Sequence, residues 1–350
     1  MINEMIPSNP ILEVTPIGLY CKLGGFYIDP QSPVEYAVVT HAHSDHARWG
    51  CRSYLAAARG EQLLRMRMSN DAAFRFLLYG EAIVINGVRI SFHPAGHILG
   101  SAQIRLEWRG YVACVTGDYK LGADPTCDPW EPVPCNLMVT ESTFGLPVYR
   151  WRPANEIHSE MNDWWRTNCN EGKCSILYGY ALGKSQRLLA CLDRSIGPIY
   201  THGAVENGTN AYRRSGVDLP ETTYVGTVTG IKDWGGSMVV AVPSANGGAW
   251  SRKFGLVSTA MASGWMAIRG ARRRRGVDRG FVMSDHVDWS ELLQAIRANN
   301  PDTLWVTHGY SAVVARYFRE QGLDSYAIDN RGRSEEEEVG NSPLGEETAK

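Results

Sequence analysis

Five short apolar runs in the chain each lead, through a few small or polar residues, to one ionisable side chain. Runs of this length that are rich in β-branched residues are typical of buried strands. They are YAVVT before His41, YVACVTG before Asp118, NLMVT before Glu141, GFVMSD before His286 and DTLWVT before His308. We expect the five strands to end together, so that the residues that follow them share one edge.

Helical periodicity separates several of these strands. Apolar residues recur at three- and four-residue spacing over 154–168, 184–193 and 289–299, which predicts three amphipathic helices. A Gly-rich loop, HPAGHILGS, joins the runs GVRISF and AQIRLEW and presents His93 and His97. Strands that alternate with helices predict the α/β class, built in layers.

The pattern of strands that end in ionisable residues stops at about residue 150 and returns near residue 275. Over 151–274, helical patterns, Gly-rich connectors and aromatic residues alternate instead, which predicts an inserted domain. We therefore expect residues 1–150 and 275–330 to form one domain together. The last segment, 331–350, carries six acidic and three basic side chains and is predicted to be a disordered acidic tail.

Composition narrows the class of protein. A chain of 350 residues with 44% hydrophobic residues can bury a large core. Its eight cysteines contain no C-x-x-C pair, which favours reduced thiols over disulfides or a zinc finger. No apolar run is long enough to span a bilayer, and the start, MINEMIPSNP, lacks the features of a signal peptide. We therefore expect a cytoplasmic protein with no membrane partner.

The segment THAHSDHARWG, residues 40–50, crowds three histidines and one aspartate into six positions. Packing alone does not explain so many ligand-type side chains, because a buried polar group needs a partner. His41 and His43, alternate residues that leave a strand, can face the same way, while Asp45 and His46 turn to a neighbouring position. This arrangement suits two metal ions better than one.

Residues from other strand ends can complete such a site. A carboxylate such as Asp118 can bridge two ions, and His97 and His308 would complete the two sets. Asp29, at the end of GGFYIDP, is a candidate to orient one ligand histidine. Imidazole-rich sites suit zinc, and the aspartates leave manganese as the other choice. Histidines scattered over the core and surface are the alternative interpretation.

Six motifs carry a family resemblance: HAHSDH, AGHILGS, TGDYK, TESTFG, SDHVDW and VTHG, in this order. Together they resemble the metallo-β-lactamase fold nucleases of the β-CASP group. The wider agreement, from GLYCKLGGFYIDP to ASGWMAIRGARRRRG, resembles the bacterial ligase-associated DNA exonucleases, relatives of Artemis. This resemblance implies a metallo-β-lactamase αββα sandwich with an inserted β-CASP cap domain. It implies two divalent metal ions, one held by His41, His43 and His97, the other by Asp45, His46 and His308, with Asp118 bridging.

The resemblance also implies which residues carry the reaction: Asp45, Asp118, Glu141 and His286. Glu141 and His286 match two β-CASP residues that act together, in which the histidine protonates the leaving oxygen and the carboxylate orients it. This role makes chemical sense, because a 3′-oxygen that departs from phosphorus is a poor leaving group and a positioned histidine can supply its proton. The alternative for Glu141 is an acid that caps a helix or turn.

Two basic features are candidates for nucleic-acid contacts. Lys184, in GKSQR, opens a predicted helix whose free amides could bind a phosphate. The run ARRRRG lies just before the strand of His286, and its cationic side chains could hold a phosphate backbone. These side chains are Arg272, Arg273, Arg274 and Arg275. A plain solvated charge run is the alternative.

These features predict a metal-dependent DNA exonuclease that works 5′→3′ in DNA repair. Its partners would be a DNA substrate and, by functional association, an ATP-dependent DNA ligase and a helicase. The alternatives are an RNA-processing nuclease of the same group and a small-molecule hydrolase of the lactamase fold. His308 is typical of the RNA-processing enzymes, and Val287 and Asp288 replace the small hydroxyl residues that follow the general-acid histidine in the DNA enzymes.

Overall fold

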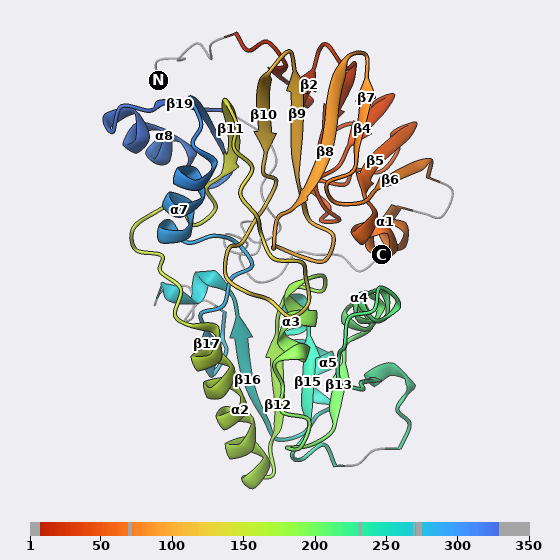
Figure 1. The fold of residues 1–350 in the computed structure, drawn as a ribbon. Coiled ribbons are helices and arrows are strands. Elements are labelled where there is room, and N and C mark those ends of the chain that lie inside the picture. Colours follow the sequence, from red (N-terminus) through yellow and green to blue (C-terminus); the bar gives the residue numbers. More distant parts are fainter. Residues whose placement is uncertain (1–7, 69–71, 231–232, 269, 271–274, 329–350) are drawn as a thin grey trace. The chain divides into compact units, whose positions relative to one another are not determined.

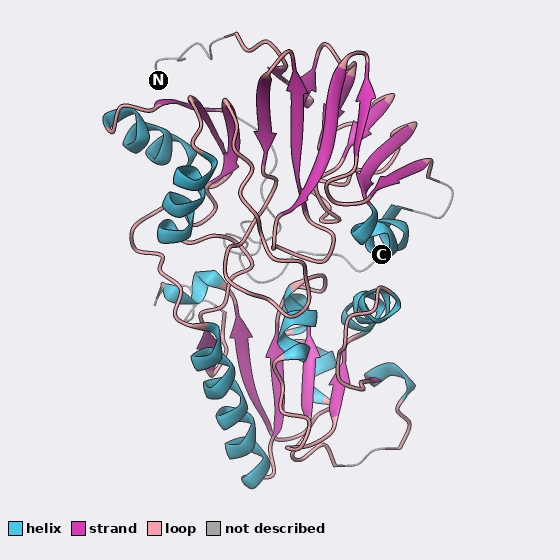
Figure 2. Cartoon of the chain, viewed as in Figure 1, coloured by secondary structure: helices cyan, strands magenta, loops and turns pink. Residues whose placement is uncertain are grey.

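The structure is a computed structural model that describes residues 8–68, 72–230, 233–268, 270 and 275–328 (Figure 1). These residues divide into two compact units. Unit 1 contains residues 8–150 and 286–328, and unit 2 contains the described residues of 151–285. Each unit combines strands with helices (Figure 2), so the predicted α/β class is confirmed.

The first sheet of unit 1 has six strands in chain order and mixes both directions. Its strands are β1 (Leu12–Thr15), β2 (Gly18–Cys21), β3 (Phe26–Ile28), β4 (Tyr36–Val38), β5 (Ser53–Ala57) and β6 (Phe74–Leu77). The first three strands are antiparallel, and β3 to β6 are parallel. A short 3₁₀ turn (Ala58–Gly60) and helix α1 (Glu61–Met68) follow β5.

The second sheet of unit 1 has seven strands in the order β19-β18-β11-β10-β9-β8-β7. They are β7 (Ala82–Ile85), β8 (Val88–Pro94), β9 (Ala102–Trp108), β10 (Tyr111–Val115), β11 (Leu137–Glu141), β18 (Thr303–Thr307) and β19 (Asp324–Ala327). β7 to β10 are antiparallel, whereas β10, β11, β18 and β19 are parallel. Strands that precede and follow unit 2 in the sequence therefore meet in one sheet.

Alternate residues of this second sheet pack into different cores, as the period of two in a strand requires. Leu137 and Val139 of β11 pack into a core that both sheets of unit 1 share. Met138, between them, packs on the other face with residues of α7 (Trp289–Asn299) and α8 (Ser311–Glu320). Unit 1 is therefore a two-sheet sandwich with helices on the outer face of the second sheet.

Unit 2 is built on a parallel sheet in the order β14-β13-β15-β12-β16-β17. Its strands are β12 (Cys174–Tyr178), β13 (Ile199–Thr201), β14 (Thr223–Tyr224), β15 (Met238–Ala241), β16 (Val257–Ala262) and β17 (Arg279–Phe281). Its helices are α2 (Ala154–Asn170), α3 (Lys184–Ala190), α4 (Gly203–Arg214) and α5 (Ala249–Arg252), with 3₁₀ turns at Val225–Thr227, Pro243–Ala245 and Gly264–Ala267. β12 and β15 are buried throughout, as is typical of parallel sheets.

The predicted single edge for five strands is wrong. The five strands belong to three sheets: β4 to the first sheet of unit 1, β10, β11 and β18 to the second, and β17 to the sheet of unit 2. An apolar run shows that a strand is buried, but it does not show which strands will be its neighbours. The helix predicted over 184–193 also ends earlier, at Ala190.

Two predictions from composition can be compared with the structure. None of the eight cysteines, all of which are described, forms a disulfide in the structure. None of the helices in the described part of the chain is both long and apolar enough to cross a membrane.

Gly100 fixes the loop between β8 and β9 that carries His97. Its φ is +80°, and a Cβ atom built on it would lie 2.1 Å from the Cα atom of Gly60. Gly87 has a similar φ of +84°, but a Cβ there would meet nothing within 4 Å. A substitution at Gly87 would therefore add backbone strain alone, whereas one at Gly100 would add both backbone strain and steric overlap.

We expect Gly87→Ala to lower the free energy of unfolding by about 1–2 kcal/mol, the cost of a left-handed residue with a Cβ. Gly100→Ala should lower it by about 1–3 kcal/mol more, because the added methyl overlaps backbone that cannot rotate away. Urea unfolding of both variants measures the difference. Equal losses would show that the contact with Gly60 does not fix the loop.

Candidate active site

The HAHSDH motif forms a tight turn directly after β4. The amides of His46 and Ala47 both donate to the carbonyl oxygen of His43, at 3.2 and 2.8 Å. The amide of Ala102, at the start of β9, donates to the carbonyl oxygen of Thr40 at 2.9 Å, which ties this loop to the second sheet. The turn places the last two ligand-type residues of the motif to one side of the first two.

Three imidazoles converge on one point. His43 Nδ1 lies 3.1 Å from His41 Nε2 and 3.0 Å from His97 Nε2. Asp118 Oδ2 lies 3.7 Å from His41 Nε2 and 3.8 Å from His97 Nε2. One atom from each of these four residues lies within 4.8 Å of the others, so the group could hold a metal ion.

Asp45, His46 and Asp118 form a second group beside the first. His46 Nε2 lies 3.7 Å from Asp45 Oδ2 and 3.5 Å from Asp118 Oδ2. The ring of His308 lies 5.6 Å from the ring of His46, centroid to centroid. The structure therefore brings all seven predicted metal ligands into two adjoining groups that share Asp118.

Three buried polar atoms of this second group indicate that it could bind a cation. Both carboxylate oxygens of Asp45 and the Nε2 atom of His46 are buried and have no hydrogen-bond partner among the described residues. Unpaired buried carboxylate oxygens are costly, because they lose hydration without compensation. A bound cation would compensate both carboxylate oxygens and would take the place of a proton on Nε2, so these residues fit a metal ion.

The electrostatics of the cluster indicate the same need for positive charge. Burial opposes protonation of His46, but the carboxylates of Asp118, Asp45 and Asp29 outweigh burial and hold the pKa of His46 well above its ordinary value. Burial, with His46, His43 and His97 nearby, holds the pKa of His41 well below its ordinary value. His41 is thus neutral, the form in which imidazole binds metals.

Asp118 keeps its negative charge despite being buried. Burial would raise the pKa of Asp118, but His46, His286 and His41 outweigh burial and hold that pKa well below its ordinary value. Its Oδ2 atom lies within 4.0 Å of a nitrogen of His41, His46, His97 and His286. The carboxylate therefore lies where it can serve both ligand groups.

Asp29 and Thr40 orient the ligand histidines. His46 Nδ1 lies 2.7 Å from Asp29 Oδ2, which leaves Nε2 of the same ring toward Asp45 and Asp118. Thr40 donates to Asp29 through both its amide, at 2.8 Å, and its hydroxyl, at 2.6 Å. The Thr40 hydroxyl also lies 3.0 Å from His41 Nδ1. Sequence reasoning missed Thr40, although a buried polar residue between a strand and a histidine cluster is a usable signal.

Glu141 and His286 form a buried pair at the edge of the cluster. His286 Nδ1 lies 2.9 Å from both carboxylate oxygens of Glu141. The amide of Tyr119 donates to Glu141 Oε1 at 3.0 Å, which fixes the carboxylate from the other side. Both side chains of the pair are almost fully buried, and the ring of His97 lies 4.7 Å from that of His286.

His308 depends on an unusual backbone that Ser142 holds in place. Its φ is +54°, and the hydroxyl of Ser142 donates to its carbonyl oxygen. The next residue, Gly309, also has a positive φ, and a Cβ there would lie 2.4 Å from the Ser142 carbonyl oxygen. The sequence THG therefore folds against the segment that follows β11, and Ser142 is a second residue that sequence reasoning missed.

The predicted nucleic-acid contacts differ in their placement. Lys184 is fully buried inside unit 2, where its Nζ atom donates to the carbonyl oxygen of Met283 at 3.0 Å. Arg272, Arg273 and Arg274 lie outside the described residues. Arg275 is half-buried, and its carbonyl oxygen accepts a hydrogen bond from Asn246 at 2.8 Å. A surface role for Lys184 does not agree with its burial.

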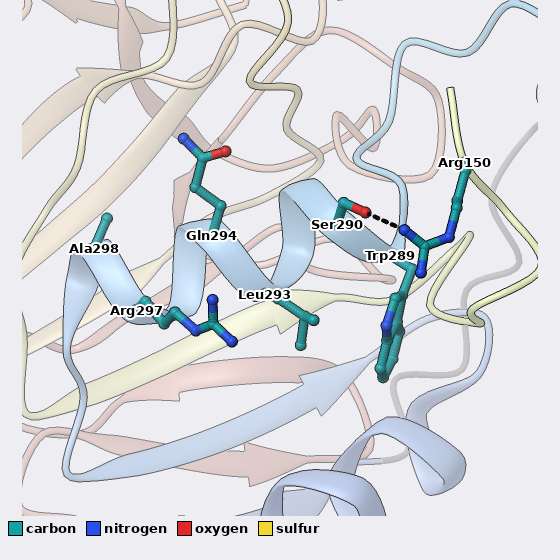
Figure 3. Close-up of a pocket in the computed structure, with 7 residues that line it drawn as sticks. All are labelled: Arg150, Trp289, Ser290, Leu293, Gln294, Arg297 and Ala298. Carbon is teal, nitrogen blue, oxygen red and sulfur yellow. Dashed lines mark hydrogen bonds between the residues drawn. The ribbon is translucent and has the colours of Figure 1, made fainter. Parts of the chain in front are cut away.

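A hollow of unit 1 lies on helix α7 (Figure 3). It has a volume of about 620 Å³, and none of the predicted site residues lines it. Trp289, Leu293 and Arg297 point to one side of α7, and Arg150 donates to Ser290 at 3.1 Å. The histidine cluster is therefore separate from this hollow.

Comparisons with known proteins place this site in context. No known family model matches the chain. The chain is 31% identical over 313 residues to a "Probable DNA ligase" of Opitutus terrae, a match that covers 89% of the chain and 30% of that protein. It is 25% identical over 211 residues to an "RNase J-like protein" of Methanocaldococcus jannaschii, over 51% of the chain and 50% of that protein. The chain thus spans half or less of these relatives.

One solved structure supports the fold alone. A protein of unknown function from Enterococcus faecalis V583 superposes with a TM-score of 0.54 and 12% sequence identity. The similarity covers 77% of this chain and 74% of that one. An arrangement that extends over most of both chains shows that the fold has a counterpart among solved structures.

We expect the purified protein to bind two divalent metal ions, because two groups of ligands share Asp118. His43→Ala should lose metal, since His43 Nδ1 is the atom on which two other imidazoles converge. Elemental analysis after reconstitution and dialysis measures the stoichiometry. His93→Ala is the matched control and should keep both ions, because His93 pairs with Glu131 away from the cluster. No more than one bound ion in the wild-type protein would contradict this expectation.

Proposed function

We propose that the chain is a metal-dependent nuclease of the metallo-β-lactamase fold and the β-CASP group, which hydrolyses phosphodiester bonds. One observation carries the proposal: a buried set of metal-type ligands adjoins a carboxylate–histidine pair, and Asp118 contacts both. In this proposal the sandwich of unit 1, described over 8–150 and 286–328, is the metallo-β-lactamase domain. The parallel sheet of unit 2, which includes β17, then belongs to the β-CASP cap.

The metal ions would be held by residues of three loops and one strand end. His41, His43 and His97 would hold one ion, Asp45, His46 and His308 the other, and Asp118 would bridge them. Zinc suits so many imidazoles, and manganese is the other choice. Two divalent ions in such a site lower the pKa of a shared water and stabilise charge on a phosphoryl group.

The chain's own residues supply the proton for the leaving group. His286 Nδ1 bonds to Glu141, and in this proposal Nε2 of the same ring faces the substrate. The Glu141 carboxylate bonds to Nδ1 and so fixes the orientation of the ring. In the protonated ring, Nε2 can donate its proton to the departing 3′-oxygen as the P–O bond breaks. Asp29 and Thr40 hold the ligand histidines in one tautomer while this happens.

DNA is the substrate that we favour. The motif resemblance to ligase-associated DNA exonucleases extends over most of the chain, and the match to the probable DNA ligase covers 89% of it. His308 and the RNase J-like relative favour RNA, the second candidate. His308 belongs to the ligand cluster, however, and a ligand does not read the 2′-hydroxyl that separates RNA from DNA. A small-molecule hydrolase would need neither the pair Glu141–His286 nor so large an insertion.

The biological setting follows from the same proposal. A DNA exonuclease of this kind would act in DNA repair, with an ATP-dependent DNA ligase and a helicase as functional associates. The arginines at 272–275 would supply cationic contacts to the phosphate backbone. We propose 5′→3′ direction on the motif resemblance.

We expect His286→Ala to keep its metal ions and to lose about 10²–10⁴-fold in turnover, the usual contribution of general acid catalysis. A substrate with an activated leaving group, which departs without a proton, should restore much of the rate. His93→Ala is the control, because His93 also pairs with a glutamate, Glu131, at 2.7 Å, outside the cluster. Equal rates for His286→Ala and wild type on ordinary DNA would remove His286 from the mechanism.

End-labelled substrates test the proposed function directly. We expect the protein to release nucleotides from the 5′ end of labelled DNA strands, and to cleave matched RNA strands more slowly. Comparison of 5′- and 3′-labelled strands gives the direction, and the DNA-to-RNA ratio of kcat/KM gives the substrate. Faster cleavage of RNA would favour the RNA-processing alternative, and nucleotide release from the 3′ end would reverse the direction.

A further inference from the structure

Four consecutive polar residues at the start of α3 are buried in unit 2. They are Lys184, Ser185, Gln186 and Arg187, and none is more than 4% exposed. Buried polar and charged side chains are costly unless each finds partners. We therefore expect each of these four side chains to have hydrogen-bond or ion-pair partners.

Two of these residues hold the segment that leads to His286. Lys184 Nζ donates to the Met283 carbonyl oxygen at 3.0 Å, and Arg187 Nη1 donates to the Ser284 carbonyl oxygen at 2.6 Å. Both carboxylate oxygens of Asp285 are ion-paired. Lys184 Nζ lies 2.8 Å from Oδ2, and Arg187 Nη1 lies 3.0 Å from Oδ1. Three successive residues are thus fixed by two cations.

The other two residues anchor α3 itself. Gln186 Oε1 accepts from the Gly183 amide at 2.7 Å, and Gln186 Nε2 donates to the Ala181 carbonyl oxygen at 3.0 Å. Ser185 donates to the Tyr180 carbonyl oxygen at 2.6 Å. These bonds tie the helix to the loop that precedes it. The backbone that carries Lys184 and Arg187 is therefore held in place.

We propose that Lys184 and Arg187 are positioning residues for general acid catalysis by His286. Asp285 is bonded covalently to His286, so a fixed Asp285 limits where the imidazole can lie. The His286 ring must meet both Glu141 and the leaving oxygen, and an error of about 1 Å in such a contact can cost about 10²-fold in rate. This inference rests on the proposed nuclease function, and it gives Lys184 a role other than phosphate binding.

The test compares Arg187→Met with Arg213→Met. Arg213 is a fair control because it also lies in unit 2 and bonds a carboxylate, Glu206, and a hydroxyl, Thr222. Both substitutions remove a guanidinium from such contacts, but only Arg187 contacts the segment before His286. Arg187→Met should lower kcat by about 10²-fold, with KM and metal content near wild type. Arg213→Met should change stability without this loss of kcat.

Three further readouts separate positioning from a general loss of structure. An activated leaving group should restore the rate of Arg187→Met, as it should for His286→Ala, and Arg187→Lys should recover part of kcat. Hydrogen–deuterium exchange should rise in the peptide that contains residues 283–287 of Arg187→Met but not of Arg213→Met. If Arg187→Met does not fold, Asp285→Asn, which keeps the shape of the side chain, should show the same loss and the same rescue.

The outcomes distinguish this inference from the proposed function. Wild-type protein that cleaves no phosphodiester would overturn both. An active wild-type protein in which Arg187→Met and Asp285→Asn match Arg213→Met in kcat would overturn the positioning role alone. A loss of kcat that an activated leaving group does not restore would also overturn it, because the defect would then not concern the proton.

Discussion

Negative charge buried among imidazoles is the constraint on which the candidate site depends. Asp118 and Asp45 are both nearly inaccessible to water, and the oxygens of Asp45 lack hydrogen-bond partners among the described residues. Burial of a carboxylate is tolerated only where cations or donors compensate it. The raised pKa of His46 shows that these carboxylates attract positive charge strongly enough to outweigh the cost of burying it. A metal centre meets the same demand.

The sandwich of unit 1 satisfies this constraint by bringing loops of two sheets together. The HAHSDH loop leaves the first sheet, whereas Asp118, Glu141 and His308 leave strands of the second. Close approach of the two sheets needs small residues: a Cβ on Gly117, next to Asp118, would lie 2.7 Å from the Cβ of Thr40. Thr40 is also the residue that bonds Asp29 and reaches His41. The same contact thus joins the sheets and orients the ligands.

Local features of the fold and site could be predicted from the sequence, but the pairing of strands could not. The helix over 289–299 appears as predicted, because its amphipathic period and its capping aspartate, Asp288, act within a few residues. The strand runs were found for the same reason. Their division among three sheets depends on contacts between distant segments, about which a local period carries no information.

The same distinction explains which site residues were found. His41, His43, Asp45 and His46 could be recognised because the ligands are crowded in one loop. Lys184 was misplaced, because a lysine at the start of a helix looks solvent-exposed until its partner, Asp285, is known to lie beside it. Thr40 and Ser142 escaped notice because a single hydroxyl gives no pattern, although Thr40 bonds Asp29 and Ser142 bonds the distant His308.

Two histidines of the site each pair with a carboxylate, but the residues around each ring suit it to a different role. His46 with Asp29 and His286 with Glu141 both bond through Nδ1, at 2.7 and 2.9 Å. Nε2 of His46 then faces the carboxylates of Asp45 and Asp118, so this ring is directed as a ligand. The atom of His286 that lies 4.0 Å from Asp118 is instead the Nδ1 already bound to Glu141. In the proposed mechanism, Nε2 of this ring donates its proton to the leaving oxygen.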